Sequence, residues 1–187
     1  MKKLLFVCHG NICRSPMAEF VMKDLVKKAG LESEFQIASA ATSREELGNP
    51  VYPPARRKLA EHGISCEGHA ARQLTNQDYE EYDLLIGMDS ANLRNMFRIC
   101  GGDYAGKMSL LMDHTNRTKR GTPSKPSALM GRGGARECSK ISPQAETENS
   151  GLCDAEVADP WYTGDFEATW QDVLEGCRGL LEEITKE

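Results

Sequence analysis

The sequence feature that most constrains this chain is the decapeptide VCHGNICRSP, which begins at residue 7 directly after a short apolar run. Five residues separate Cys8 from Arg14, and Ser15 follows at once, giving the pattern C-x5-R-S. The run Lys2–Cys8 is too short for a helix and is typical of a buried strand. From Ser15 onward apolar residues recur at helical spacing, with Ser15 as the expected cap and Pro16 in the first turn. We therefore predict a loop between a strand and a helix.

The rest of the chain alternates the same two kinds of element. Further buried strands are expected at Phe35–Ala40, Tyr82–Met88 and Lys107–Met112. Helices are expected over residues 55–63, after a cap at Asp89 or Ser90, and over the amphipathic stretch Phe166–Ile184. This alternation indicates an α/β fold with a parallel sheet covered on both faces. Ligands of such sheets bind at the carboxyl ends of the strands, where the Cys8 loop would lie.

Residues 118–154 do not fit this alternation. They contain no aromatic residue, little apolar periodicity and many Gly, Ser and Pro residues. Such a segment cannot bury enough apolar surface to offset the entropy of ordering it. We therefore expect one domain over residues 1–187, interrupted by a flexible surface insertion at about 118–154.

Charge and composition limit the partners. The net charge is −5, which argues against nucleic acid or an anionic membrane as the main partner. No signal peptide and no run of about twenty apolar residues is visible, so we expect a cytoplasmic protein. The seven cysteines lack CxxC pairs. The His, Cys and acidic residues lack the spacing of metal ligands, so neither a metal site nor a cofactor is expected.

The decapeptide has the chemistry of an anion cradle. Bent around an anion, its backbone N–H groups would point inward, and the following helix would add its positive end. Arg14 offers a planar fork that matches two phosphate oxygens. The same groups would stabilise a thiolate at Cys8, and Ser15 can donate its hydroxyl to the sulfur. The predicted phosphate-binding residues are His9, Gly10, Asn11, Ile12, Cys13, Arg14 and Ser15.

A plainer interpretation of the loop is a chance match in which Cys8 is a small buried hydrophobe. The strand before the loop, the helix after it and the flanking GN and RSP argue against chance. A nucleotide-binding loop is excluded because the Gly-x4-Gly-Lys-Ser/Thr and Gly-x-Gly-x-x-Gly patterns are absent from these positions. A functional phosphate site is therefore the favoured hypothesis.

Three segments resemble the low-molecular-weight protein tyrosine phosphatase family. They are VCHGNICRSPMAE at residues 7–19, HAARQLT with DLLIGMDSANLR at 69–75 and 83–94, and ADPWYTGDFEATW at 158–170. The resemblance spans nearly the whole chain apart from the insertion. It implies a flavodoxin-like fold with a four-stranded parallel sheet, of the phosphotyrosine phosphatase I type. It also implies metal-independent hydrolysis of phosphotyrosine in proteins by a monomer or weak dimer.

The resemblance implies roles for the matching residues. Cys8 would be the nucleophile that forms a phosphocysteine, and Arg14 would hold the phosphate oxygens. Asp159 would be the general acid, and Pro160 would stiffen the turn that presents it, although Asp-Pro also opens ordinary turns. The residues expected to hold the loop and thiolate in place are Asn11, Ser15 and His69. His69 could instead be a structural histidine.

The resemblance also implies a substrate rim and a redox partner. The rim residues are His9, Ile12, Trp161 and Tyr162. An aromatic-walled cleft suits a phosphorylated phenol better than a phosphoserine, whereas Trp161 and Tyr162 could alternatively be core aromatics. Cys13 would form a reversible disulfide that protects Cys8 from oxidation, with a buried filler as the alternative.

Two rival functions share the loop. A thioredoxin-coupled arsenate reductase needs a relay cysteine soon after the third strand, and no cysteine follows there until Cys100. A catalytically impaired phosphotyrosine-binding module would be expected to lose Cys8 or Asp159, and both are present. The insertion ends shortly before Asp159, so we expect retained phosphate binding with weakened acid catalysis. A phosphatase is the favoured function.

Overall fold

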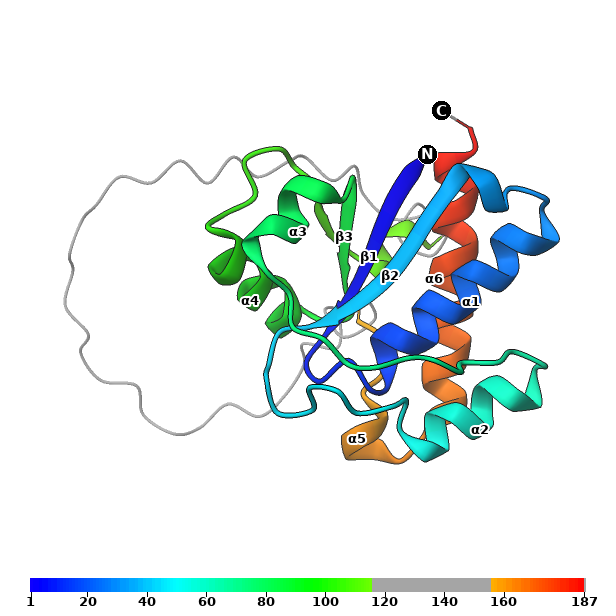
Figure 1. Ribbon diagram of the computed structural model, residues 1–187. Coiled ribbons are helices and arrows are strands. Elements are labelled where there is room, and N and C mark those ends of the chain that lie inside the picture. Colours follow the sequence, from blue (N-terminus) through cyan, green and yellow to red (C-terminus); the bar gives the residue numbers. More distant parts are fainter. Residues whose placement is uncertain (116–155, 187) are drawn as a thin grey trace, which may run out of the picture.

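The computed structural model describes residues 1–115 and 156–186, and the predicted insertion at 118–154 lies outside the described residues. Its centre is a four-stranded parallel sheet in the order β2-β1-β3-β4 (Figure 1). The strands are β1 (Lys2–Cys8), β2 (Phe35–Ala41), β3 (Leu84–Gly87) and β4 (Met108–Leu110). The predicted α/β fold class is therefore confirmed.

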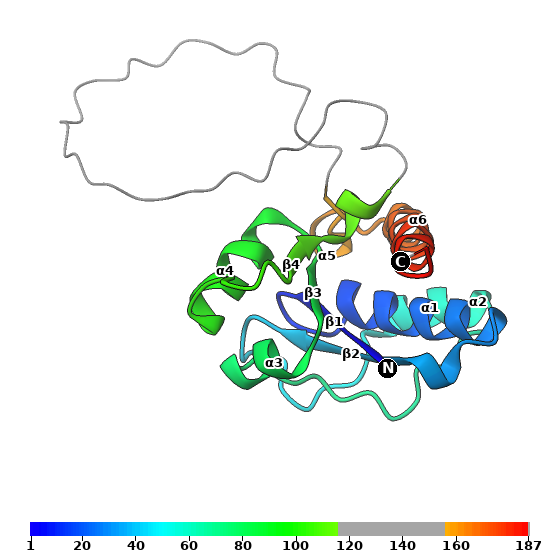
Figure 2. The same cartoon turned by 90° about the horizontal axis from the view of Figure 1, so that it is seen from above.

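Helices cover both faces of the sheet, as predicted (Figure 2). They are α1 (Arg14–Lys28), α2 (Pro53–Glu61), α3 (Asn76–Glu81), α4 (Ser90–Cys100), α5 (Pro160–Thr163) and α6 (Phe166–Ile184), with 3-10 turns η1 (Glu32–Glu34) and η2 (Leu111–His114). Helices α1, α2 and α6 lie on one face, and α3 and α4 lie on the other. No helix in the described part is both long enough and apolar enough to span a membrane.

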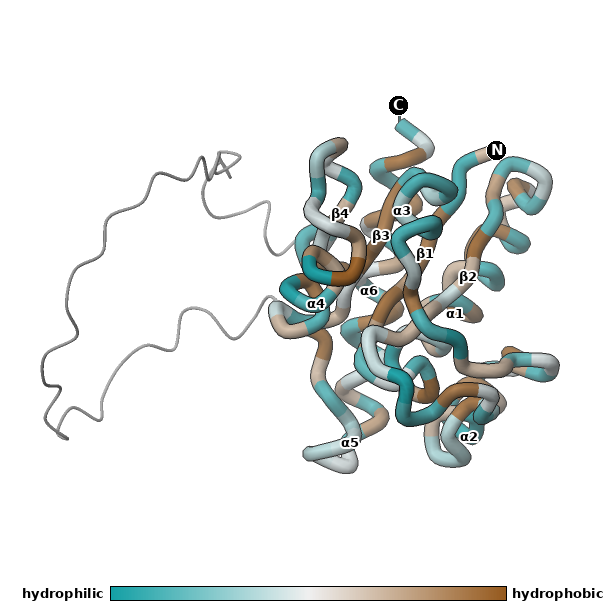
Figure 3. The backbone as a smooth tube through the Cα atoms, turned by 60° about the vertical axis from the view of Figure 1, so that its left-hand side comes forward, coloured by the Kyte–Doolittle hydropathy of each residue, from teal (hydrophilic) through white to brown (hydrophobic). Residues whose placement is uncertain are grey.

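Strand β1 supplies both halves of the hydrophobic core. Successive side chains of a strand point to opposite faces. Leu4 and Phe6 accordingly pack in the cluster with α1 and α6, whereas Leu5 and Val7 pack in the cluster with α3 and α4. A strand that is buried on both faces is continuously apolar, which explains the run that precedes the decapeptide and the hydrophobic colour along β1 and β3 in Figure 3.

Two local expectations were wrong. Helix α1 begins at Arg14 with Cys13 as its N-cap, and no side chain caps it. Ser15 therefore lies inside the helix, where its hydroxyl contacts the Cys8 sulfur instead of a backbone N–H. Helix α3 was not predicted, because six residues are too few to show a clear apolar period. A reciprocal capping box between Thr75 and Asp78 starts it.

Helix α6 approaches η2 closely because it carries two glycines on the contacting face. A Cβ atom on Gly179 would lie 1.9 Å from the carbonyl oxygen of His114, and one on Gly176 would lie 2.5 Å from the side chain of Leu111. Only a residue without a side chain allows this backbone contact. The glycines thereby allow α6 to pack against η2, which directly follows β4.

Candidate active site

The loop between β1 and α1 wraps around the sulfur of Cys8, which is buried. Asn11 has a φ of +57°, in the left-handed region that asparagine tolerates better than most residues. This turn brings the backbone N–H of Asn11 to 3.3 Å from Cys8 Sγ. The Ser15 hydroxyl lies 3.0 Å from the same sulfur. The sulfur therefore has two hydrogen-bonding neighbours from its own loop and helix.

The hydrogen bonds of Asn11 set the direction of the Ser15 hydroxyl. The Oδ1 atom of Asn11 accepts from the backbone N–H of Arg72 at 3.1 Å, so the amide Nδ2 faces Ser15 Oγ at 2.9 Å and Ser39 Oγ at 2.7 Å. Both amide protons are thereby donated. Because Ser15 accepts one of them, its own proton is available to Cys8, whose sulfur lies nearer than its other acceptor, the Ala40 carbonyl at 3.4 Å.

Glu19 and His69 extend this hydrogen-bond network through Ser39 and the backbone of Asn11. Ser39 donates to Glu19 Oε2 at 2.5 Å. His69 Nε2 lies 2.8 Å from the carbonyl oxygen of Asn11, and its Nδ1 lies 4.0 Å from Glu19. His69 thus lies where a supporting residue was predicted. Glu19 and Ser39 were missed, because nothing in the sequence marks a buried glutamate of α1 as the partner of a serine in β2.

Arg14 projects into the pocket between two carboxylates. Its Nη1 atom lies 2.6 Å from Asp89 Oδ2, and its Nη2 atom lies 2.6 Å from Asp159 Oδ2. Burial acts to lower the pKa of Arg14, but the charges of Cys8, Asp159 and Asp89 raise it above its ordinary value. Asp89 was predicted as a cap of α4, and its Oδ1 does accept from the Asn92 N–H at 2.6 Å. Its second role, orienting Arg14, was missed.

Asp159 stands at the start of α5, where its Oδ1 accepts from the Trp161 N–H at 3.0 Å. Two contacts hold the segment before it. The Val157 N–H donates to the carbonyl of Met88, just after β3, and Thr169 of α6 donates to the carbonyl of Ala158, each at 2.9 Å. The segment before Asp159 is therefore held on one side by the end of β3 and on the other by helix α6.

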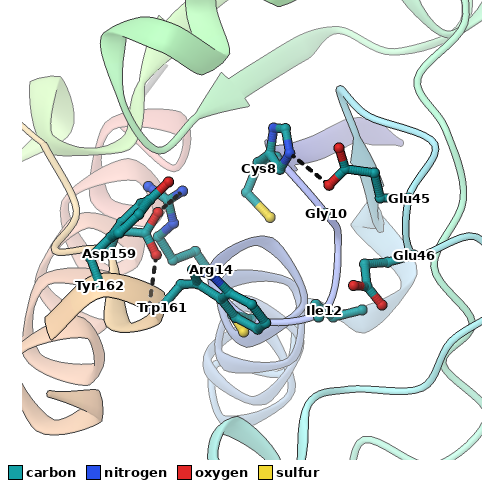
Figure 4. A pocket seen from close by; sticks show the side chains of 11 residues that line it. Cys8, Gly10, Ile12, Arg14, Glu45, Glu46, Asp159, Trp161 and Tyr162 are labelled. Atoms are coloured by element: carbon teal, nitrogen blue, oxygen red, sulfur yellow. Dashed lines mark hydrogen bonds and ion pairs between the residues drawn. The ribbon is translucent and has the colours of Figure 1, made fainter. Parts of the chain in front are cut away.

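These groups surround one cavity of about 250 Å³ (Figure 4). Its lining residues are Cys8, His9, Gly10, Ile12, Cys13, Arg14, Glu45, Glu46, Asp159, Trp161 and Tyr162. All the predicted rim residues are among them. Trp161 is 61% exposed and Tyr162 is 86% exposed, so the alternative that they are core aromatics is wrong. Glu45 and Glu46 were missed, because only the fold brings their segment beside the loop.

Cys13 is buried at the N-terminus of α1 and lines the same cavity. Burial raises the pKa of its thiol to about 12, and the negative charges of Cys8 and Asp159 act in the same direction. Cys8 and Cys13 are both free thiols in this structure. The predicted reversible disulfide between them stays a prediction. Within residues 1–115 and 156–186, no group of three or more His, Cys, Asp or Glu side chains is placed to hold a metal ion.

Comparison with known proteins identifies relatives of the whole chain. The family model described as "Low molecular weight phosphotyrosine protein phosphatase" matches residues 3–125. The low molecular weight protein-tyrosine-phosphatase YfkJ of Bacillus subtilis is 34% identical over 187 residues, covering 100% of this chain and 98% of that protein. The human low molecular weight phosphotyrosine protein phosphatase is 33% identical over 183 residues, covering 97% and 94%.

Solved structures agree with these sequence relatives. The crystal structure of YfkJ superimposes with a TM-score of 0.77 at 33% identity, covering 100% of this chain and 96% of that one. The structure of SP-PTP, a low molecular weight protein tyrosine phosphatase from Streptococcus pyogenes, gives a TM-score of 0.71 at 33% identity, covering 98% and 93%.

Proposed function

The chain belongs to the low molecular weight phosphotyrosine protein phosphatase family, and we propose that it hydrolyses phosphotyrosine in proteins through a phosphocysteine on Cys8, without a metal ion. One observation carries this mechanism. The Cys8 sulfur accepts hydrogen bonds in a cavity whose wall presents both a guanidinium, Arg14, and a carboxyl group, Asp159. A nucleophile, an anion clamp and a proton donor therefore meet around one space.

Substrate binding uses the guanidinium of Arg14. Asp89 holds the Nη1 side of the fork, and Asp159 occupies the Nη2 side. The phosphate dianion of the substrate would take the place of the Asp159 carboxylate at Nη2 and accept further hydrogen bonds from the loop amides. The displaced carboxyl group then stands next to the ester oxygen, where an acid is needed.

In the first chemical step, the Cys8 thiolate attacks phosphorus in line with the tyrosine oxygen. The sulfur–phosphorus bond forms as the phosphorus–oxygen ester bond breaks, and protonated Asp159 gives its proton to the departing phenolate oxygen. Arg14 and the loop amides stabilise the charge on the three equatorial oxygens. The products are the free tyrosine hydroxyl and phosphocysteine.

In the second step, water attacks phosphocysteine. The carboxylate of Asp159 takes a proton from the water, the sulfur–phosphorus bond breaks, and inorganic phosphate and the Cys8 thiolate are released. The Ser15 hydroxyl, which is directed at the sulfur by Asn11, stabilises the thiolate as it leaves. Thiolate release in this step and thiolate attack in the first therefore depend on the same donors.

A preference for phosphotyrosine follows from the position of the nucleophile. Cys8 is buried at the end of β1, whereas Trp161 and Tyr162 are exposed at the rim of the same cavity. A substrate must reach from the rim to the sulfur, and a phenol spans more of that depth than a serine side chain. The exposed aromatic rings offer apolar contact to the phenol ring.

The thioredoxin-coupled arsenate reductase reaction is disfavoured by the position of Cys100. This residue ends α4, whereas Asp89, which contacts Arg14, precedes the same helix. Eleven helical residues rise about 16 Å, so the thiol is far from the anion site. Cys100 is also buried, and its burial raises its pKa to about 11. A buried neutral thiol at that distance is a poor relay for Cys8.

We place the enzyme in the cytoplasm and expect a monomer or weak dimer acting on phosphoproteins. The five cysteines of the described ranges are all free thiols, which suits a reducing compartment. The acidic net charge gives no support to nucleic acid or an anionic membrane as a partner.

The test is hydrolysis of p-nitrophenyl phosphate with EDTA present, by the wild type and by Cys8→Ser. We expect turnover in EDTA that the substitution abolishes. Acid quenching of the wild type during turnover should trap one phosphoryl group on Cys8, detected by mass spectrometry. Cys66→Ala, a buried cysteine outside the active-site cavity, is the matched control and should keep its turnover. A folded wild type without turnover would refute the proposal, and loss of turnover in EDTA would refute metal independence.

A further inference from the structure

We infer that this pocket selects phosphotyrosine that is flanked by lysine or arginine in the substrate chain. The inference rests on the proposed function, since it concerns which phosphotyrosines reach Cys8. Two glutamates that the mechanism does not use, Glu45 and Glu46, form one wall of the cavity. Figure 4 shows them on the side opposite Asp159 and Tyr162.

The segment after β2 is fixed beside the phosphate loop by backbone hydrogen bonds. The Thr42 N–H donates to the Cys8 carbonyl at 2.8 Å, and the Ser43 N–H donates to the His9 carbonyl at 2.9 Å. Glu46 packs directly on the loop, because a Cβ atom on Gly10 would lie 3.3 Å from Glu46 Cγ. The acidic wall is therefore built into the fold at the mouth of the pocket.

Among the described residues, neither Glu45 nor Glu46 forms an ion pair with a lysine or arginine. Glu46 hydrogen-bonds the uncharged side-chain amide of Asn49 at 2.6 Å. Glu45 lies 3.3 Å from Nε2 of the exposed His9, which is charged only when protonated. Of the lining residues in the described part of the chain, Arg14 is the single lysine or arginine, and two aspartates already contact it. The mouth of the pocket therefore carries excess negative charge.

A peptide with its phosphate group over Cys8 must place its neighbouring residues at this mouth. A lysine or arginine there is attracted to Glu45 and Glu46, and an aspartate or glutamate is repelled. The aromatic residues of the rim act in the same direction, because the exposed rings of Trp161 and Tyr162 can attract a cation. The two glutamates and the aromatic rim thus both favour basic flanking residues.

The size of the effect is limited by solvent. Glu45 is largely exposed, and an exposed ion pair changes an equilibrium by at most about fivefold. When a basic peptide is compared with an acidic one, attraction of the first and repulsion of the second both increase the ratio of their kcat/KM values. We therefore expect a difference of about tenfold between them, decreasing as salt screens the charges.

The experiment uses three phosphotyrosine peptides of equal length that carry lysine, glutamine or glutamate on both sides of the phosphotyrosine. We expect the wild-type kcat/KM to be about tenfold higher for the lysine peptide than for the glutamate peptide. In the double variant Glu45→Gln/Glu46→Gln the ratio should fall to about twofold. Glu32→Gln/Glu34→Gln makes the same change at η1, before β2 and at the opposite edge of the sheet, and should keep the wild-type ratio.

The outcomes separate this inference from the proposed function. If the wild type fails to hydrolyse p-nitrophenyl phosphate, which has no flanking residues, the phosphatase proposal itself fails. If it hydrolyses that ester but treats the three peptides equally, only the basic-flank inference is overturned. A lysine-to-glutamate peptide ratio that stays near tenfold in the double variant, or that salt does not reduce, would also overturn the assignment to the two glutamates.

Discussion

The Nη2 atom of Arg14 lies 2.6 Å from the Oδ2 atom of Asp159, so the proposed phosphate clamp and the proposed general acid are in direct contact. The Arg14 side chain is only 5% exposed, and Asp89 already occupies its Nη1 atom. A phosphate dianion and the Asp159 carboxylate therefore compete for one donor. Several expected outcomes depend on this geometry.

Replacing Asp159 should affect chemistry and binding in opposite directions. Asp159→Asn removes the proton donor, so kcat should fall by about 10²–10⁴. It also removes the charge that competes at Arg14, so inorganic phosphate should inhibit at lower concentration. Steady-state kinetics with phosphate as inhibitor measures both. Asp165→Asn, the same change at the N-cap of α6, is the control. An unchanged inhibition constant would show that Asp159 does not compete for Arg14.

Two substitutions at Asp89 should separate its two roles. Asp89→Asn keeps a good helix cap but loses the charged hydrogen bond to Arg14, worth about 1.5–3 kcal/mol, so kcat/KM should fall about tenfold to a hundredfold. Asp89→Ala should lose the cap as well, so its free energy of unfolding should be about 1 kcal/mol lower than that of Asp89→Asn. Urea unfolding beside kinetics distinguishes them. Equal activity of the wild type and Asp89→Asn would contradict the orienting role.

Replacement of Ser15 and of Ser39, the two serines that hydrogen-bond Asn11, should have different effects. Ser15→Ala removes the hydroxyl directed at Cys8 Sγ, so alkylation of Cys8 by iodoacetamide and kcat should both slow. Ser39→Ala keeps that hydroxyl but removes the hydrogen bonds that Ser39 makes with the Asn11 amide and with Glu19 Oε2, so the free energy of unfolding should fall by about 1–3 kcal/mol. If Ser39→Ala slowed alkylation as much as Ser15→Ala, the two roles would not be separate.

Peroxide should inactivate the wild type reversibly and Cys13→Ser irreversibly. Oxidised Cys8 carries a sulfenic acid, and the Cys13 thiolate would attack its sulfur to form the disulfide, releasing hydroxide that takes a proton from solvent to become water. Because the pKa of Cys13 is raised to about 12, few of these thiols are ionised near neutral pH, and disulfide formation should accelerate as pH rises. Recovery of activity after dithiothreitol at several pH values measures this. If Cys13→Ser recovered as much activity as the wild type, Cys13 would have no protective role and would be only a buried side chain that fills space beside the loop.

Gly179→Ala should destabilise the fold although alanine is the better helix former. In an open helix the change stabilises by about 1 kcal/mol. Here the new methyl group would meet the carbonyl oxygen of His114 at 1.9 Å, so α6 must move from η2, at a cost of about 1–3 kcal/mol. Thermal unfolding should show a lower Tm. A higher Tm would mean that α6 packs less closely than this structure has it.

Elements with a strong local pattern were predicted with accurate ends. Strand β1 and helix α6 have the predicted bounds, because a continuous apolar run and a long amphipathic period are properties of neighbouring residues. Strand β4 is shorter than predicted, since its pairing ends where η2 turns away. Helix α3 was missed because it is held by the Thr75 capping box and by packing of Tyr79, not by a period of its own.

The sequence by itself determined the anion loop of this protein. Cys8, Asn11, Arg14 and Ser15 lie within eight consecutive residues, and a strand, a turn and a helix in that order bring them together around one point. The remaining parts of the site were decided by tertiary structure. Asp89, Glu46 and Asp159 come from three separate segments, and they lie around the same site because parallel strands end at one edge of the sheet. No local pattern records that convergence, since it depends on which strands pair and where α6 packs.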